Sequence, residues 1–190
     1  MNYLSITKRW FINVASIVIV ILLTVSVLLL LSMRNYYYGV ASMALDAYTS
    51  DKIASTFSLY DASSSGFESA GREFVENFPD KDIMAVWIID RHGNIILSSS
   101  GFQIKENVDM PDYVNALNSS NGIARWTGKL PSGEKIMAST CIYNYSTGVQ
   151  GGAVRFMISL EQIESQLIRI SITIALAAIA LFALLMFSGS

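Results

Sequence analysis

The sequence predicts an α+β membrane protein in which two transmembrane helices flank one folded domain, built on a five-stranded antiparallel sheet with a long N-terminal helix. Three observations predict this class. The 190 residues are 52% apolar and 15% charged, with a mean hydropathy of +0.43, which is too apolar for an ordinary soluble domain. Apolar segments without charged residues occupy 11–31 and 170–187. Between them, short β-branched runs alternate with turn residues.

Each apolar segment is long enough to form a membrane span, because a helix rises about 1.5 Å per residue and the hydrocarbon layer is about 30 Å thick. We assign residues 11–33 to the first transmembrane helix and residues 168–187 to the second. A signal peptide is the competing interpretation of the first segment. Its apolar run is longer than a signal peptide needs, and no clear small-residue cleavage site follows it.

The placement of charges orients the two helices. Lys8 and Arg9 precede the first helix, whereas all 15 Asp and Glu residues lie between the two helices. The positive-inside rule therefore places residues 1–10 in the cytoplasm and residues 34–169 outside. Residues 188–190 would begin a second cytoplasmic part, and we expect the parent chain to continue past them.

The outer domain, residues 34–167, is predicted to begin with helices. Residues 34–60 contain no proline and carry apolar side chains near helical spacing, so the first membrane helix is expected to continue outward. Ser65 and Glu68 form a capping box for a second helix, which Pro79 ends. The apolar stripe of this helix comprises Phe67, Ala70, Gly71, Phe74, Val75 and Phe78.

Five runs between turns predict the sheet. The first two, 84–90 and 95–98, flank His92-Gly93-Asn94, which is typical of a tight hairpin turn. The other three lie at 123–130, 134–145 and 149–159, with Pro, Ser and Gly in the short connections. Sequential strands with short turns favour antiparallel pairing, so we expect one sheet of five strands.

A short helix is predicted between the second and third strands. We expect Asp109 to cap it and Pro111 to lie in its first turn. Tyr113, Val114 and Leu117 are expected to form its apolar side.

The last helix carries the spacing of a coiled coil. We expect Ser159 to cap this helix. Apolar residues then recur at spacings of 3, 4 and 3, typical of the seam between two helices, at Leu160, Ile163, Leu167 and Ile170. A plain amphipathic helix packed on its own domain is the alternative interpretation.

The residue inventory excludes several kinds of site. Cys141 is the single cysteine and His92 the single histidine, so neither an intramolecular disulfide nor a Cys/His zinc site is expected. His92 stands in a predicted turn, which argues against nucleophilic catalysis. The net charge of −2 gives no basic field for nucleic acid. We therefore predict no catalytic residues, no metal and no cofactor in this chain, and no nucleic-acid partner.

Two motifs carry a family resemblance. Residues 87–99 read Trp-Ile-Ile-Asp-Arg-His-Gly-Asn-Ile-Ile-Leu-Ser-Ser, and residues 151–160 form an apolar strand that is followed by Glu161-Gln162-Ile163. Together they resemble the opening strands and the exit of the extracytoplasmic single-Cache, or PDC, sensor domains of bacterial transmembrane sensor histidine kinases. The resemblance covers residues 34–187. It implies a PAS-like fold with a long N-terminal helix on one side of the sheet and a pocket on the other face.

The resemblance also implies a function. The chain would sense a small molecule or a state of the envelope, and would signal through the helix seam of a homodimer in the bacterial inner membrane. The receiving two-component histidine kinase, which would need ATP and Mg²⁺ and would act on a response regulator, lies outside this chain. A chemoreceptor or a cyclic-dinucleotide enzyme is an alternative output. A membrane scaffold that passes no signal is a further alternative.

Aromatic and cationic side chains on the predicted strands and short helix are candidates for a ligand site, since such groups suit a small carboxylate. They are Tyr113, Arg125, Trp126, Lys129, Tyr143 and Arg155. Strand alternation places Arg125 and Trp126 on opposite faces. The alternative is that the aromatic side chains cover the sheet and the arginines are solvated. We also interpret Asp80, Asp82, Asp109 and Asp112 as solvated rather than as a cation site.

Overall fold

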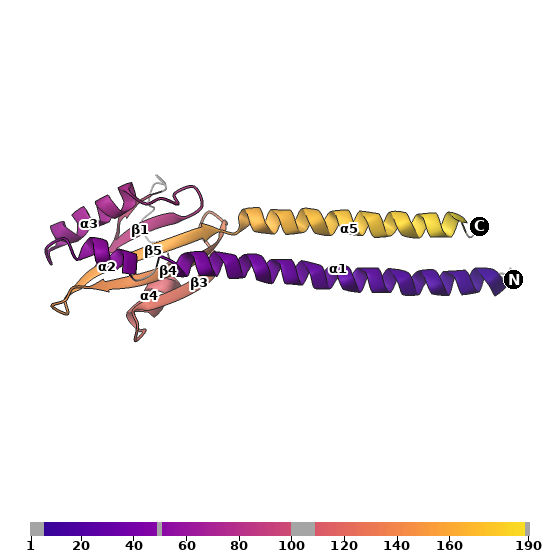
Figure 1. Cartoon of the computed structure of the whole chain (residues 1–190), viewed down its shortest axis with the longest axis horizontal. Helices are drawn as coiled ribbons and strands as arrows, with labels where there is room; N and C mark the ends of the chain where they lie inside the picture. The colour runs from indigo at the N-terminus through magenta and orange to yellow at the C-terminus, as the bar shows by residue number, and fades with distance from the viewer. Residues whose placement is uncertain (1–5, 49–50, 100–108, 189–190) are drawn as a thin grey trace. The chain divides into compact units, whose positions relative to one another are not determined.

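The computed structural model describes residues 6–48, 51–99 and 109–188. Along the chain, its elements are α1 (Ile6–Asp46), α2 (Asp51–Phe57), α3 (Ser64–Glu76), β1 (Ala85–Asp90), β2 (Ile95–Ser98), α4 (Pro111–Leu117), β3 (Ile123–Lys129), β4 (Lys135–Asn144), β5 (Gln150–Ser159) and α5 (Glu161–Ser188) (Figure 1). The chain divides into a helical unit, residues 1–38 with 162–190, and an α+β domain, residues 39–161. The predicted fold class is confirmed.

The sheet has the order β2-β1-β5-β4-β3, and every neighbouring pair is antiparallel. The last strand, β5, therefore lies in the centre, between β1 and β4. Its ladder with β4 is the longest, running from Ile136 opposite Ser159 to Asn144 opposite Gln150. The prediction of one antiparallel sheet of five strands is confirmed.

One face of the sheet, called here the α3 face, has an aromatic core. The rings of Phe74 and Phe78 each lie 6.1 Å from the ring of Phe156 on β5, and Phe57 lies 4.9 Å from Phe67. All of these rings are buried. Aromatic burial of this kind contributes to the apolar stabilisation of the α+β domain.

The hairpin between β1 and β2 is held by its aspartate. The carboxylate of Asp90 accepts hydrogen bonds from the backbone N–H groups of His92 and Asn94, both at 2.8 Å, and Gly93 has φ +86°. Burial acts to raise the pKa of Asp90, but the hydrogen bonds from Asn94 and His92 outweigh it and lower that pKa. The predicted turn is confirmed, with His92 exposed.

The helices differ from the sequence prediction in three places. α1 ends at Asp46 instead of running on to residue 60, and α2 is a separate helix. Tyr48 is buried there, with its ring 4.9 Å from that of Phe78. The cap of α3 is Ser63, not Ser65: Ser63 is extended and its Oγ accepts the Gly66 N–H at 2.9 Å. Glu68 instead pairs with Arg72 one turn later.

The third difference concerns α4. Its N-cap is Met110, which makes no side-chain capping bond, so the predicted cap at Asp109 is wrong, whereas Pro111 begins the helix as predicted. Val114 and Leu117 are 54% and 46% exposed. α4 buries Asp112 with Tyr113 and Ala116, because that carboxylate has a cationic partner inside the domain.

Two helices are long and apolar enough to cross a membrane. The qualifying segments are Asn13–Asp46 and Glu161–Leu181, each of which contains an 18-residue window with a mean hydropathy of 3.2 and 1.6, respectively. Almost none of the side chains in these two windows is buried, so their apolar surface is free to contact lipid.

Gly152 on β5 is expected to tolerate no side chain. A Cβ there would overlap the Ile89 carbonyl oxygen and the Phe67 ring. Gly152→Ala should therefore lower the free energy of unfolding by about 1–3 kcal/mol, measured by denaturant titration with tryptophan fluorescence. The control is Gly39→Ala, where nothing lies within 4 Å; it should be neutral or stabilising. Equal losses in both variants would contradict this packing.

Candidate functional site

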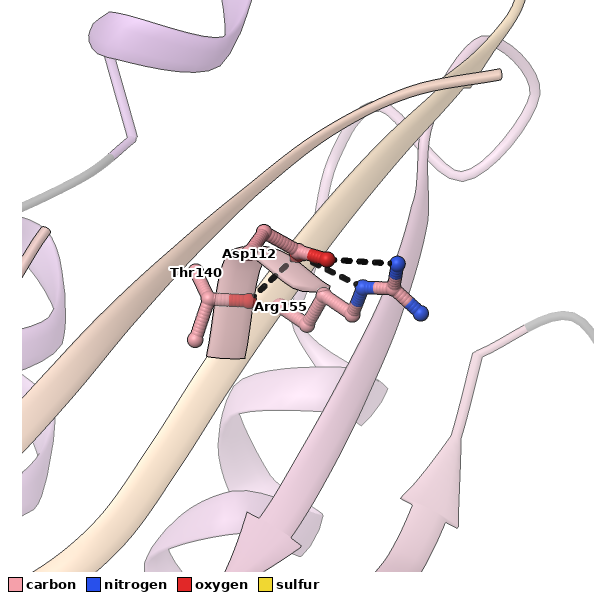
Figure 2. A network of polar contacts seen from close by, with 3 residues as sticks. All are labelled: Asp112, Thr140 and Arg155. Carbon is pink, nitrogen blue, oxygen red and sulfur yellow. Dashed lines mark hydrogen bonds and ion pairs between the residues drawn. The ribbon is translucent and has the colours of Figure 1, made fainter. Parts of the chain in front are cut away.

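The α+β domain holds a fully buried polar centre made of Asp112, Thr140 and Arg155 (Figure 2). Arg155 donates from Nε to Asp112 Oδ2 and from Nη2 to Asp112 Oδ1, both at 2.7 Å. Thr140 Oγ1 donates to Asp112 Oδ2 at 2.6 Å. The two parallel bonds make this a bidentate guanidinium–carboxylate pair, the strongest geometry that such a pair adopts.

Strand register brings these groups together. Arg155 on β5 lies opposite Trp87 on β1 and opposite Thr140 on β4, so the three side chains share one face of the sheet. Asp112 reaches them from the first turn of α4. We call this side of the sheet the α4 face.

Two buried donors in this centre have no acceptor among the described residues. They are Arg155 Nη1 and Trp87 Nε1. The guanidinium carbon of Arg155 lies 5.3 Å from the centre of the Trp87 ring, within the range of a cation–π contact. An unsatisfied buried donor is costly, so the pair favours the approach of an oxygen acceptor.

A cavity of about 280 Å³ opens on the same face next to Trp87. Its walls are apolar where Met157 and Ile136 contribute, and Lys81 and Glu134 place charges of both signs at its edge. Ser159, the last residue of β5, also lines it. The cavity therefore lies at the end of the sheet where the chain leaves for α5.

The structure divides the six candidate ligand residues between the two faces. Arg155 and Tyr113 are buried on the α4 face, and Trp126 packs there against the cluster of Trp87 and Met157. The other three side chains lie on the opposite side of the sheet. Tyr143 packs on Phe57, and Arg125 contacts α1. Lys129 is exposed and shares the face of Arg125, because residues four apart on a strand point to the same side. The six residues therefore do not form one site, and their role in binding stays a prediction.

The predicted separation of Arg125 from Trp126 is confirmed by the register of β3 on β4. Arg125 donates a hydrogen bond to Ser42 Oγ and pairs with Asp46. It therefore fastens the end of α1 to an edge strand.

Sequence reasoning missed three contributors to the buried centre, namely Trp87, Asp112 and Thr140. The interpretation of Asp112 as solvated is wrong, because Arg155 and Thr140 satisfy its carboxylate inside the core. One signal was available. Arg155 stands within the apolar run Val154 to Ile158, and a lone arginine in a buried strand needs a buried acid.

Two other ionisable groups on the strands and α4 stay neutral. Burial raises the pKa of Cys141 to about 11, so its thiol is protonated at neutral pH and is no nucleophile. Burial, with the nearby charge of Asp90, raises the pKa of Tyr113, which keeps its hydroxyl as a donor. Neither group points to chemical catalysis.

The four residues of the predicted helix seam lie in two different environments. Leu160 is fully buried in the α+β domain and precedes α5, so it is unavailable to a second copy of the chain. Ile163, Leu167 and Ile170 are half-buried on α5. The expected cap is weak: Ser159 Oγ accepts the Glu161 N–H at 3.4 Å. A seam between two copies stays a prediction for the three residues on α5.

No protein-family model and no curated protein matches this sequence. The chain is similar to the ligand-binding domain of the Pseudomonas aeruginosa PAO1 amino acid chemoreceptor PctC in complex with GABA (TM-score 0.47, 16% identity, 69% of this chain and 63% of that one). It is also similar to the ligand-binding domain of the Pseudomonas fluorescens chemoreceptor CtaA in complex with L-serine (TM-score 0.39, 16% identity, 70% and 61%). A Mycobacterium tuberculosis transcriptional regulator is more distant (TM-score 0.37, 16% identity, 52% and 34%).

The chain spans less than two thirds of each of these three structures. Its fold and its buried centre define it as an α+β domain with a five-stranded antiparallel sheet between two apolar helices.

Breaking the buried ion pair should be costly. Arg155→Met leaves the Asp112 carboxylate uncompensated, and the free energy of unfolding should fall by about 3–5 kcal/mol in denaturant titrations. The double variant Asp112→Leu/Arg155→Met should recover much of this loss, because neither charge remains. Arg72→Ala, which breaks the exposed pair with Glu68, should change stability by less than about 0.5 kcal/mol. Equal effects of Arg72→Ala and Arg155→Met would contradict this assignment.

Proposed function

We propose that the chain is the sensory and membrane-spanning region of a bacterial transmembrane receptor whose output is a two-component histidine kinase. One observation supports this most directly. The buried centre lies on β5, and only Leu160 separates β5 from α5. A ligand that changes the environment of Arg155 therefore acts on the strand that continues into an apolar helix.

The apolar helices support membrane insertion. Ile17 and Leu28 on α1, and Ile172 and Leu176 on α5, are exposed in the chain, as are many other large apolar side chains of both helices. A soluble protein rarely exposes apolar surface of this extent, whereas lipid covers it at no cost. With Lys8 and Arg9 at the cytoplasmic side, the α+β domain is outside the cell.

The ligand that best fits the α4 face is a small carboxylate with an apolar body. Arg155 already holds one carboxylate, and its Nη1 and the Trp87 Nε1 lack acceptors among the described residues. The neighbouring cavity has apolar walls that suit the rest of such a molecule. Tyr113 and Trp126 stand on the same face as further contacts.

Transmission through the membrane needs little energy. A coupling of about 1–3 kcal/mol changes an equilibrium roughly 5–150-fold. In a homodimer, Ile163, Leu167 and Ile170 would form the contact between the two copies of α5, and its two packings would correspond to the two output states. A chemoreceptor or a cyclic-dinucleotide enzyme would use this region in the same way. The coding sequence past Ser190 would distinguish a kinase, a chemoreceptor or a cyclic-dinucleotide enzyme from a scaffold that has no output domain.

Labelling of intact cells tests the proposed topology. A cysteine at Ser132, in the exposed turn between β3 and β4, should react with a membrane-impermeant maleimide. A cysteine at Asn2 should react only after the cells are permeabilised. Both variants carry Cys141→Ser, although the native thiol is buried and protonated. Labelling at Asn2 in intact cells, or protection at Ser132, would refute this orientation.

Disulfide cross-linking tests transmission. Cysteines at Ile163 or Leu167 should form cross-links between copies, and activating conditions of the parent receptor should change the yield several-fold. Cysteines at Ile168, an exposed α5 residue between the proposed contact positions, serve as the matched control and should cross-link poorly. Yields at Ile163 and Leu167 that no activating condition alters would exclude signalling through this seam.

A further inference from the structure

We propose that Asp112 is an internal competitor of the ligand: α4 holds this carboxylate in the guanidinium site of Arg155, and a small carboxylate from outside displaces it. The inference rests on the proposed function, since it concerns the same site. It adds a mechanism of regulation, in which the unliganded domain is closed by its own side chain.

The geometry shows what the site selects. Two donors of Arg155, Nε and Nη2, engage both oxygens of Asp112, and Thr140 donates a third bond. The site is therefore built to bind a carboxylate, and it is occupied by one that belongs to the chain. A second carboxylate at the same edge of the guanidinium would repel the first, because two like charges at this distance disfavour one another. Ligand and Asp112 thus exclude each other at the bidentate edge.

The helix that carries Asp112 is short, and its buried contacts with the sheet centre on the ion pair, Tyr113 and Ala116. α4 has seven residues, and its N-cap Met110 makes no side-chain bond. A helix of this length has little stability of its own. Val114 and Leu117 face solvent, so besides Asp112 only Tyr113 and Ala116 are buried. Among the described residues, α4 makes one ion pair, which joins Asp112 to Arg155.

Competition of this kind explains a buried ion pair in a sensory domain. Such a pair gains little net stability over an apolar contact, whereas it can specify one of two arrangements. In the closed arrangement, Arg155 is bound to α4. In the liganded arrangement, Arg155 is bound to the incoming carboxylate, Nη1 and the Trp87 Nε1 gain acceptors, and α4 is released from the sheet.

Chemical rescue by acetate tests the competition on the full chain in lipid nanodiscs, with sodium chloride added to match ionic strength. Asp112→Ala removes the internal carboxylate and leaves room for acetate beside Arg155. Acetate should raise the melting temperature of this variant by several degrees, with a midpoint at least about tenfold lower than in the wild-type chain. The response should vanish in Asp112→Ala/Arg155→Met.

Hydrogen exchange tests whether the Asp112 carboxylate holds α4 on the sheet. In Asp112→Ala with acetate, amides of α4 should exchange at least about tenfold faster than in the wild-type chain, while those of α3 stay unchanged. Asp112→Asn keeps the shape of the side chain and should also speed the exchange of the α4 amides. This variant replaces Asp112→Ala in the test if the alanine variant does not fold. The matched control is Glu76→Ala, which removes an exposed carboxylate at the end of α3, away from the cavity, and should behave as wild type.

Three results would overturn the competition: an acetate midpoint equal in the wild-type chain and both Asp112 variants, a response that survives Arg155→Met, or α4 exchange unaltered by either Asp112 substitution. None of these results bears on membrane topology or on cross-linking along α5. The receptor proposal therefore stands or falls separately.

Discussion

The guanidinium of Arg155 imposes the main constraint on the α+β domain. It stands on the central strand with no exposed surface, so its charge has to be met inside the protein. Asp112 on α4 forms the ion pair with it, Thr140 donates a further hydrogen bond to the Asp112 carboxylate, and the Trp87 ring lies beside the guanidinium. The position of α4, the inward turn of its acidic residue and the outward turn of Val114 and Leu117 all follow from this one requirement.

The two faces of the sheet differ in their chemistry. The α3 face is an aromatic cluster around Phe156, where packing is dense and Gly152 admits the Phe67 ring. The α4 face combines a charged centre, two donors without acceptors among the described residues, and a cavity. Residues 155 and 156 are neighbours on β5 but face opposite sides of the sheet, so one strand joins the aromatic face to the face with the charged centre.

Periodicity and turn chemistry predicted the elements well, because these signals are local. The strands around Gly93 and the two apolar helices follow directly from alternation and length. The site was harder to predict from the sequence, because Asp112 and Arg155 are far apart along the chain and their pairing depends on tertiary contacts. The apolar side of α4 was also predicted from local spacing alone. Val114 and Leu117 satisfy hydrophobic spacing, but the helix buries Asp112 for the ion pair and leaves these two side chains exposed.

The central place of β5 has a mechanical consequence. Because β5 is hydrogen-bonded along both edges, to β1 from Gly152 to Met157 and to β4 from Gln150 to Ser159, a force on its C-terminal end is opposed by both ladders. An edge strand would have one ladder to oppose the same force. A displacement of β5 therefore has to disturb its pairing with β1 and with β4 together.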